Sequence, residues 1–177
     1  MNSFDTHEVF NQVPPFEDVD LFDCDLALRE GLVREGGAWA VDALSTLGRR
    51  CGAGTAQELA RLANLHSPRL RAFDRQGNRV DQVEFHPAWH ALMTLLVESG
   101  AHAAPWSAPR PGAHVARAAG YLLFGQLENG AQCPVTMTYA AVAALRHAPA
   151  LAATGCRRSW PGRTIRVRYR CRPSAAP

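Results

Sequence analysis

The chain has 177 residues, of which 47% are hydrophobic and 20% charged, with a formal net charge of +3 at pH 7. This length suits one domain with a buried core, or a domain with a tail. No apolar run approaches the roughly eighteen residues of a membrane span, and the N-terminus lacks the basic start and apolar stretch of a secretory signal. We therefore expect a cytoplasmic protein that makes no membrane contact.

Cysteine usage indicates the same compartment. The five cysteines are odd in number, scattered and without a Cys-x-x-Cys pair: Cys24, Cys51, Cys133, Cys156 and Cys171. A disulfide framework needs paired cysteines in an oxidising environment, so we expect reduced thiols that serve packing rather than chemistry.

The net charge divides unevenly along the chain. Every basic residue is arginine, and seven arginines lie after residue 155, whereas all 16 acids lie at or before Glu128. Residues 1–155 therefore carry 12 arginines and 16 acids, a net charge of −4. The basic character belongs to the tail at 151–177, which could contact nucleic acid through phosphates.

The first half of the chain predicts an arm, three helices and a hairpin. Residues 1–22 contain Pro14-Pro15 and four phenylalanines, which is typical of an extended arm laid over a neighbouring surface rather than of a free linker. Helices are then expected from Asp23 or Asp25 as cap to about Glu35, from Ala38 to about Arg50, and from a Thr55–Glu58 capping box to Leu65. Their expected apolar contacts are Leu26, Leu28, Leu32, Val33, Trp39, Leu44, Leu47, Leu59 and Leu62. Between Leu70 and Phe85, two short strands around a glycine-containing turn predict a small β-hairpin.

Pro87 begins the next predicted helix, with His86 at its cap and Trp89, Leu92, Met93 and Leu96 as its core stripe. His86 and His90 are four residues apart and could share a face, which raises a metal hypothesis. Pro87 replaces the glutamate of a His-Glu-x-x-His zinc helix, and no third ligand has a supporting spacing. We therefore expect a cap and a hydrogen-bonded histidine, and no metal.

The last part predicts a loop and two helices. Gly100–Gly112 is expected to be a loop in which Trp106 acts as a plug, and Ala113–Glu128 a helix closed by Asn129-Gly130. The helix from Cys133 to about His147 is almost without charge, which is typical of a helix buried on all sides. Residues 23–150 are therefore expected to form a helical bundle. Its carboxylates Glu84, Glu98 and Glu128 are expected to be solvated surface groups.

Four motifs together resemble the N-terminal domain of the AidB-type acyl-CoA dehydrogenases, the flavoproteins of the adaptive response to DNA alkylation. They follow in family order from about residue 6 to about residue 150. The motifs are Thr6-His7-Glu8-Val9-Phe10-Asn11-Gln12, Arg61-Leu62-Ala63-Asn64, Phe85-His86-Pro87-Ala88-Trp89-His90 and Cys133-Pro134-Val135-Thr136-Met137-Thr138-Tyr139-Ala140-Ala141.

The resemblance implies an acyl-CoA dehydrogenase-like helical fold, FAD, a homotetramer, dehydrogenase chemistry on acyl-CoA-like substrates, and DNA binding by the full-length protein. In that family the flavin, the catalytic carboxylate and the DNA surface depend mainly on regions that follow this domain. The flavin motifs Met-Thr-Glu/Lys and Gly-Gly-Ser-Asp do not occur in these 177 residues. No catalytic residue is therefore carried over. Thr136, Thr138 and Tyr139 are placed by the resemblance where the cavity for flavin and substrate meets the helical domain.

Two functional hypotheses follow from these observations. The first is the N-terminal piece of a flavin-dependent oxidoreductase that is inactive by itself. The second is a non-enzymatic helical interaction module, or a nucleic-acid binder that uses its arginine-rich tail. A flavin absorbance band supports the first, and salt-dependent DNA retardation that needs residues 156–177 supports the second.

The tail itself predicts a frameshift. From Gly155 onward, acids and leucines vanish and Arg, Pro, Gly and Cys dominate, as in an out-of-frame reading of a GC-rich gene. Back-translation of residues 155–165 with GC-rich codons, read two bases later, gives Leu-Pro-Ala-Leu-Leu-Ala-Gly-Pro-Asp-Tyr, which is similar to the family's continuation. We therefore expect residues 151–177 to be disordered.

Overall fold

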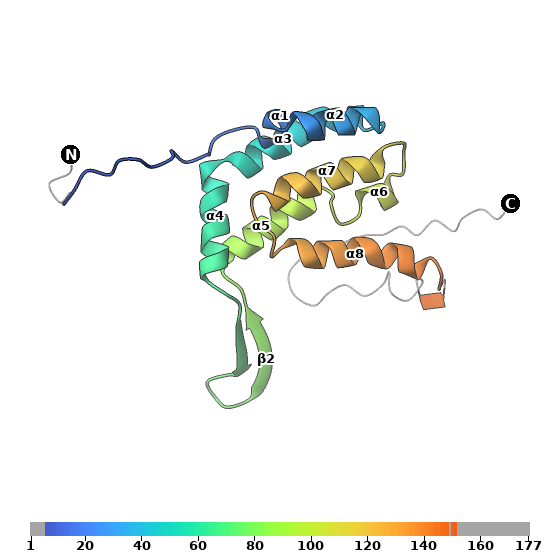
Figure 1. Ribbon diagram of the computed structural model, residues 1–177. Helices are drawn as coiled ribbons and strands as arrows, with labels where there is room; N and C mark the ends of the chain where they lie inside the picture. Colours follow the sequence, from blue (N-terminus) through green and yellow to red (C-terminus); the bar gives the residue numbers. More distant parts are fainter. Residues whose placement is uncertain (1–5, 149, 152–177) are drawn as a thin grey trace.

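The computed structural model describes residues 6–148, 150 and 151 (Figure 1). Within this part the chain is mainly helical with one two-stranded antiparallel hairpin, which confirms the predicted fold class. The elements in order are α1 (Leu21–Cys24), α2 (Leu26–Arg34), the 3-10 turn η1 (Ala38–Ala40), α3 (Val41–Gly52), α4 (Gly54–Leu65), β1 (Arg69–Phe73), β2 (Arg79–Glu84), α5 (Pro87–Glu98), α6 (Ala104–Ser107), α7 (Ala113–Gly125) and α8 (Gln132–Leu145). The predictions for 152–177 lie outside the described residues.

The helices form three layers, with α1, α2 and α3 on one side, α5 and α7 in the middle and α8 on the other side (Figure 1). Their apolar faces meet in one core, as amphipathic helices require. The largest fully buried side chains are Phe22, Leu32, Cys51, Leu92, Leu96, Leu123 and Phe124. None of the described helices combines the length and apolar character needed to span a membrane.

The N-terminal arm is shorter than expected, and residues 6–15 extend away from the domain. Helix α1 already begins at Leu21, and Phe22 is fully buried. Before it, residues 6–15 leave the body as an extended segment (Figure 1). The exposed fractions of the apolar side chains there and at Phe16 are 64% to 91% (Val9, Phe10, Val13 and Phe16), and the Phe16 carbonyl oxygen accepts a hydrogen bond from Gln57 on α4 at 2.6 Å. The arm therefore offers apolar side chains to solvent within this chain.

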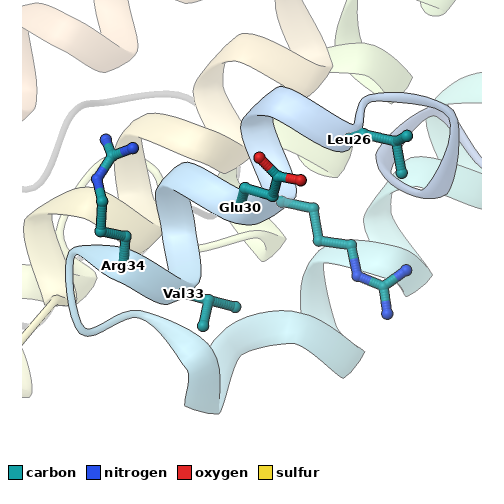
Figure 2. A pocket seen from close by; sticks show the side chains of 5 residues that line it. Leu26, Glu30, Val33 and Arg34 are labelled. Atoms are coloured by element: carbon teal, nitrogen blue, oxygen red, sulfur yellow. The ribbon is translucent and has the colours of Figure 1, made fainter.

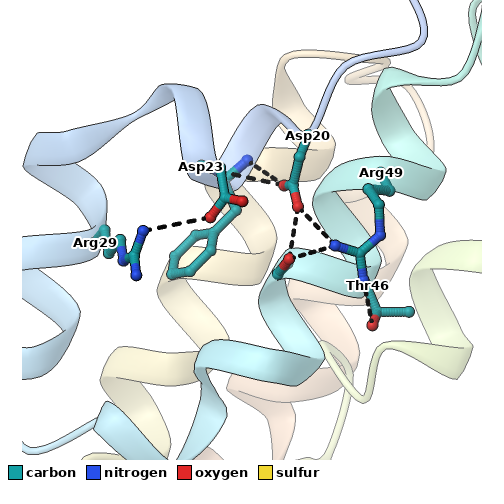
Figure 3. A network of polar contacts seen from close by, with 7 residues as sticks. Asp20, Asp23, Arg29, Thr46 and Arg49 are labelled. Carbon is teal, nitrogen blue, oxygen red and sulfur yellow. Dashed lines mark hydrogen bonds and ion pairs between the residues drawn. The ribbon is translucent and has the colours of Figure 1, made fainter.

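Asp20 fastens α1 onto α3. One carboxylate oxygen accepts the backbone N–H groups of Phe22 (3.0 Å) and Asp23 (3.3 Å), so Asp20 caps α1. The other oxygen accepts hydrogen bonds from Ser45 Oγ (2.6 Å) and Arg49 Nη1 (3.0 Å) on α3 (Figure 3). The Asp20 side chain is only 12% exposed, and a carboxylate so largely removed from water is stable only when such donors satisfy it.

Helix α2 begins as predicted and exposes more apolar surface than predicted. Asp25 is its cap, because its side chain accepts the Leu28 N–H at 2.9 Å. Leu32 is buried, whereas Leu26 and Val33 are 65% and 50% exposed.

Trp39, expected as an apolar contact of the following helix, is 44% exposed. This difference arises because the predicted helix begins with the separate turn η1, which places the ring at the surface under the Arg110 guanidinium. The indole Nε1 donates to the Pro111 carbonyl oxygen at 3.0 Å.

The capping box predicted at Thr55 was wrong. Helix α4 begins at Gly54, its N-cap residue is Ala53, and no side chain of the neighbouring sequence caps it. Instead Asp18, far back in the chain, accepts the Gly54 N–H at 3.0 Å. The free N–H groups of a helix start need an acceptor, and here it comes from the segment just before α1.

The hairpin is confirmed and projects away from the helices (Figure 1). The Asp74 carboxylate accepts the N–H groups of Gln76 and Asn78, and Gly77 has φ +86°, which together close the turn. The apolar side chains of both strands remain largely exposed.

Helix α5 starts as predicted, with Pro87 in its first turn and His86 Nδ1 accepting the Ala88 N–H at 3.2 Å. Leu92 and Leu96 are fully buried and Met93 is half-buried. Trp89, expected in the core stripe, is half-buried and stacks on Phe85 at 4.1 Å between ring centroids.

Two predictions for the last part were wrong. The loop at 100–112 contains the short helix α6, on which Trp106 is half-buried. Glu128, expected to be solvated, is buried, because its carboxylate accepts the N–H groups of Gly130 and Ala131 before α8.

Helix α8 was expected to be buried on all sides, and this was wrong for the described chain. Gln132 and Val135 are buried, whereas Met137 is 67% exposed. The reason is that the described elements cover only one side of α8, so its low charge content does not correspond to burial within this chain.

Candidate functional site

The three predicted site residues lie on α8, and two of them face α7. Thr136 Oγ1 donates to the Tyr121 hydroxyl at 2.7 Å, and Tyr139 contacts His114 and Trp106. Thr138 Oγ1 instead donates to the Pro134 carbonyl oxygen of its own helix at 3.0 Å. The structure therefore brings Thr136 and Tyr139 together with α7 and leaves Thr138 outside this group.

Tyr139 is the centre of an aromatic cluster between α6, α7 and α8. Its hydroxyl is hydrogen-bonded to His114 Nδ1 at 2.5 Å, and its carbonyl oxygen accepts the Trp106 Nε1–H at 3.0 Å. The Trp106 ring lies 5.2 Å from the Tyr139 ring and 4.8 Å from the His114 ring, measured between centroids. Tilted and edge-to-face rings that also share hydrogen bonds hold the helices at a defined distance.

Two arginines join this cluster. The Arg117 guanidinium carbon lies 3.7 Å from the Tyr139 ring centroid and 4.9 Å from that of Tyr121, and Nε donates to the Ala101 carbonyl oxygen at 2.7 Å. Arg146 lies over Trp106 at 4.5 Å. Burial lowers the pKa of the Arg117 guanidinium from its ordinary value, and Tyr139 and Tyr121 oppose this shift.

We call this group the α7–α8 seam; it consists of Trp106, His114, Arg117, Tyr121, Thr136, Tyr139 and Arg146. The sequence named Thr136 and Tyr139 as cavity lining and Trp106 as a plug of its loop, and it did not single out the other four residues. Arg117 left one signal, since it is the single charged residue in the helix Ala113–Gly125. Which helix covers such a charge is a tertiary property that the sequence pattern does not contain.

The histidines near α5 have structural partners. His86 caps the helix and stacks on His66 at 4.6 Å between centroids, while His90 meets the edge of the Trp89 ring at 5.2 Å. Across the described residues, no three His, Cys, Asp or Glu side chains converge into a possible metal site.

Two hollows on the surface of the described chain are shallow. One runs along the outer side of α2 and is lined by Leu26, Arg29, Glu30, Val33 and Arg34, all from a single helix (Figure 2). Another lies between α3, α4 and α5, beside Arg50 and Leu59. A flavin site encloses most of its ligand, so neither hollow fits FAD, and we derive no chemical step through the flavin from these residues.

The described cysteines differ sharply in accessibility. Cys24 and Cys133 are exposed free thiols, whereas Cys51 is buried in the core. Burial raises the pKa of the Cys51 thiol to about 11, and Arg50 opposes the shift by a smaller amount. A thiol that stays protonated is a poor nucleophile.

We therefore expect Cys24 and Cys133 to react with a thiol reagent in the folded protein and Cys51 only on unfolding. The Cys156→Ser/Cys171→Ser background removes the two remaining thiols, and mass spectrometry counts the labels. The pKa of the Cys51 thiol is higher in the folded chain than in the unfolded chain, so the protonated thiol favours folding. This contribution to the free energy of unfolding is complete below the ordinary pKa of 9.0 and is lost as pH rises through about 11. Labelling of Cys51 as fast as Cys24 at neutral pH would contradict the buried placement.

Known proteins resemble this chain in sequence and in fold. The family of the adaptive response protein AidB N-terminal domain matches residues 11–160. The acyl-CoA dehydrogenase homologue AidB of Escherichia coli (strain K12) is 47% identical over 137 residues, which is 77% of this chain and 25% of that protein. The chain thus spans about a quarter of the length of this relative.

Two solved structures share the fold. The apo-form of Bd2924 has a TM-score of 0.69 and 27% identity over 78% of this chain and 28% of its own. Caenorhabditis elegans ACDH-11, solved in complex with C11-CoA, has a TM-score of 0.66 and 24% identity over 80% of this chain and 25% of its own. The helical layers, the hairpin and the family match agree, and the chain belongs to the family of AidB N-terminal domains.

Proposed function

We propose that this chain acts as the N-terminal helical domain of a flavin-dependent, acyl-CoA dehydrogenase-like protein. In this proposal α8 forms one wall of the cavity for flavin and acyl substrate, with Thr136, Thr138 and Tyr139 on that wall. The observation that supports it is the exposed, uncharged side of α8, where Met137 is 67% exposed and Cys133 is also exposed. Apolar surface of this kind usually receives another domain or a ligand.

In a complete protein of this type, a bound flavin would supply the capacity for hydride acceptance from the acyl substrate. The residues of this chain would contribute shape and exclusion of water rather than reacting groups. Thr136 and Tyr139 hold α8 against α7 through Tyr121 and His114, so they would keep that wall in place. We therefore propose that the chain alone is inactive.

We expect the purified 177-residue chain to bind no FAD stoichiometrically, because its described hollows are too open to enclose the cofactor. The protein is mixed with excess FAD, separated by gel filtration and examined for flavin absorbance in the protein peak. AidB of Escherichia coli, treated in the same way, is the positive control. A near one-to-one ratio of flavin to this chain would sink the prediction.

We also propose that the domain self-associates, as part of a homotetramer in the complete protein. The exposed side of α8 and the apolar arm supply surface for such contacts. We expect the sedimentation coefficient to rise with concentration, and Met137→Glu to reduce this rise. Gln82→Glu on the exposed strand β2 is the matched control for the added charge. A concentration-independent monomer would count against self-association.

DNA binding, in this proposal, belongs to the complete protein rather than to the described domain. The described residues include 12 arginines and 15 acids, because Asp5 is the one acid of the 16 that lies outside them. Their net charge is therefore 12 − 15 = −3. A net negative surface disfavours contact with a phosphate backbone.

A further inference from the structure

Arg117 carries a charge that its own surroundings do not balance. Its Nη2 atom is shielded from solvent and has no hydrogen-bond partner among the described residues. Nε is already bound to the Ala101 carbonyl oxygen. Leaving a shielded guanidinium N–H without an acceptor costs free energy, so a ligand that supplies a hydrogen-bond acceptor would be stabilised here.

The helices around Arg117 contain no carboxylate that could serve. Neither α6, α7 nor α8 has an Asp or Glu in its sequence. Glu128, between α7 and α8, already accepts the N–H groups of Gly130 and Ala131. Among the described residues, Arg117 and Arg146 form no ion pair.

The two cations contact two neighbouring rings. Arg117 stacks on Tyr139 at 3.7 Å and Arg146 on Trp106 at 4.5 Å, and these two rings are 5.2 Å apart. Cation–π contacts fix the direction of a guanidinium without neutralising it. The Nη2 group, which has no partner, can then donate to an oxygen of a carboxylate or a phosphate that reaches it.

We propose that Arg117, assisted by Arg146, forms an oxyanion-binding site in the α7–α8 seam. The ligand is a phosphate or carboxylate group, one oxygen of which reaches Nη2 of Arg117. Arg117 supplies the hydrogen bonds and Arg146 supplies additional positive charge. The site is independent of the proposed flavin-protein function, because the described chain itself holds both arginines.

The test uses the whole 177-residue chain labelled with ¹⁵N. The Arg117 Nε–H signal, assigned by its loss in Arg117→Gln, is followed while pyrophosphate, phosphate or acetate is added at constant ionic strength with sodium chloride. We expect a saturable shift that chloride alone does not produce. Preference for pyrophosphate indicates a phosphate-bearing small molecule, and equal or stronger binding of acetate indicates a carboxylate; either result supports the site.

Variants make the assignment specific. In Arg117→Gln, the Trp106 indole N–H signal reports binding, and we expect affinity to fall about ten- to a hundredfold, the usual effect of removing hydrogen bonds to a charged group. Should Arg117→Gln not fold, Arg146→Gln, altered at an exposed side chain, still reports, with a smaller loss expected. Arg34→Gln on α2 removes an equal charge away from the seam and should bind as the unaltered chain does. Equal shifts with chloride, or equal losses in Arg34→Gln and Arg146→Gln, would overturn the site.

Discussion

Replacing Phe22 by Ala is expected to lower the free energy of unfolding by about 3–5 kcal/mol, the usual cost of emptying a buried aromatic site. Phe22 is fully buried although it lies on the short helix α1, the first of the packed helices. Its side chain packs into the core cluster that α3 shares with α7. Urea unfolding followed by circular dichroism at constant slope measures the loss.

Phe16→Ala is the matched control, because it makes the same chemical change on a side chain that is 64% exposed. We expect this variant to stay within about 0.5 kcal/mol of the unaltered chain, as surface substitutions usually do. Losses of similar size at both positions would mean that the arm is packed onto the body, contrary to its extended course in Figure 1.

Replacing Gly112 by Ala is expected to be comparably severe, at about 3 kcal/mol or more, since both strain and overlap contribute. Gly112 has φ +72°, a conformation that costs an L-residue about 1–2 kcal/mol. An added Cβ would also lie among the backbone atoms of Gly36 and Gly37, with the closest, the Gly36 carbonyl oxygen, at 2.3 Å. Backbone on both sides must then move, which separates the turn after α2 from the start of α7.

Two other glycines separate these contributions. Gly77→Ala meets φ +86° with no atom within 4 Å of the new Cβ, so only the strain of about 1–2 kcal/mol is expected. Gly31→Ala, inside α2 with equal space and without positive φ, should stabilise by about 0.5–1 kcal/mol. Thermal unfolding of the three variants checks the order, and a Gly112→Ala loss no larger than that of Gly77→Ala would rule out the backbone overlap.

Sequence by itself determined the features that depend on near neighbours in the chain. Asp25 caps α2, His86 and Pro87 start α5, and Gly77 closes the hairpin, as their positions predicted. Each of these depends on a contact within a few residues, where the identity of the side chain and its spacing decide the backbone conformation. The four motifs likewise predicted the family, because they combine identity with order along the chain.

The tertiary structure alone decided which distant groups satisfy one another. Asp18 caps α4 in place of Thr55, because the segment just before α1 lies beside Gly54. Trp39 lies at the surface because Arg110 and the turn before α7 meet it there. A hydrogen-bond acceptor or a stacking cation that comes from a remote segment produces no recognisable residue spacing in the local sequence.

The candidate site shows the same division. Thr136 and Tyr139 were predicted by resemblance, but their contacts to α7 and the unbalanced charge of Arg117 emerged only from the packing of α8 on α7. Burial was the property that sequence predicted least well, since α8 is free of charge yet half exposed in this chain. The composition of a helix indicates which surroundings it can pack against, whereas the fold determines which residues surround it.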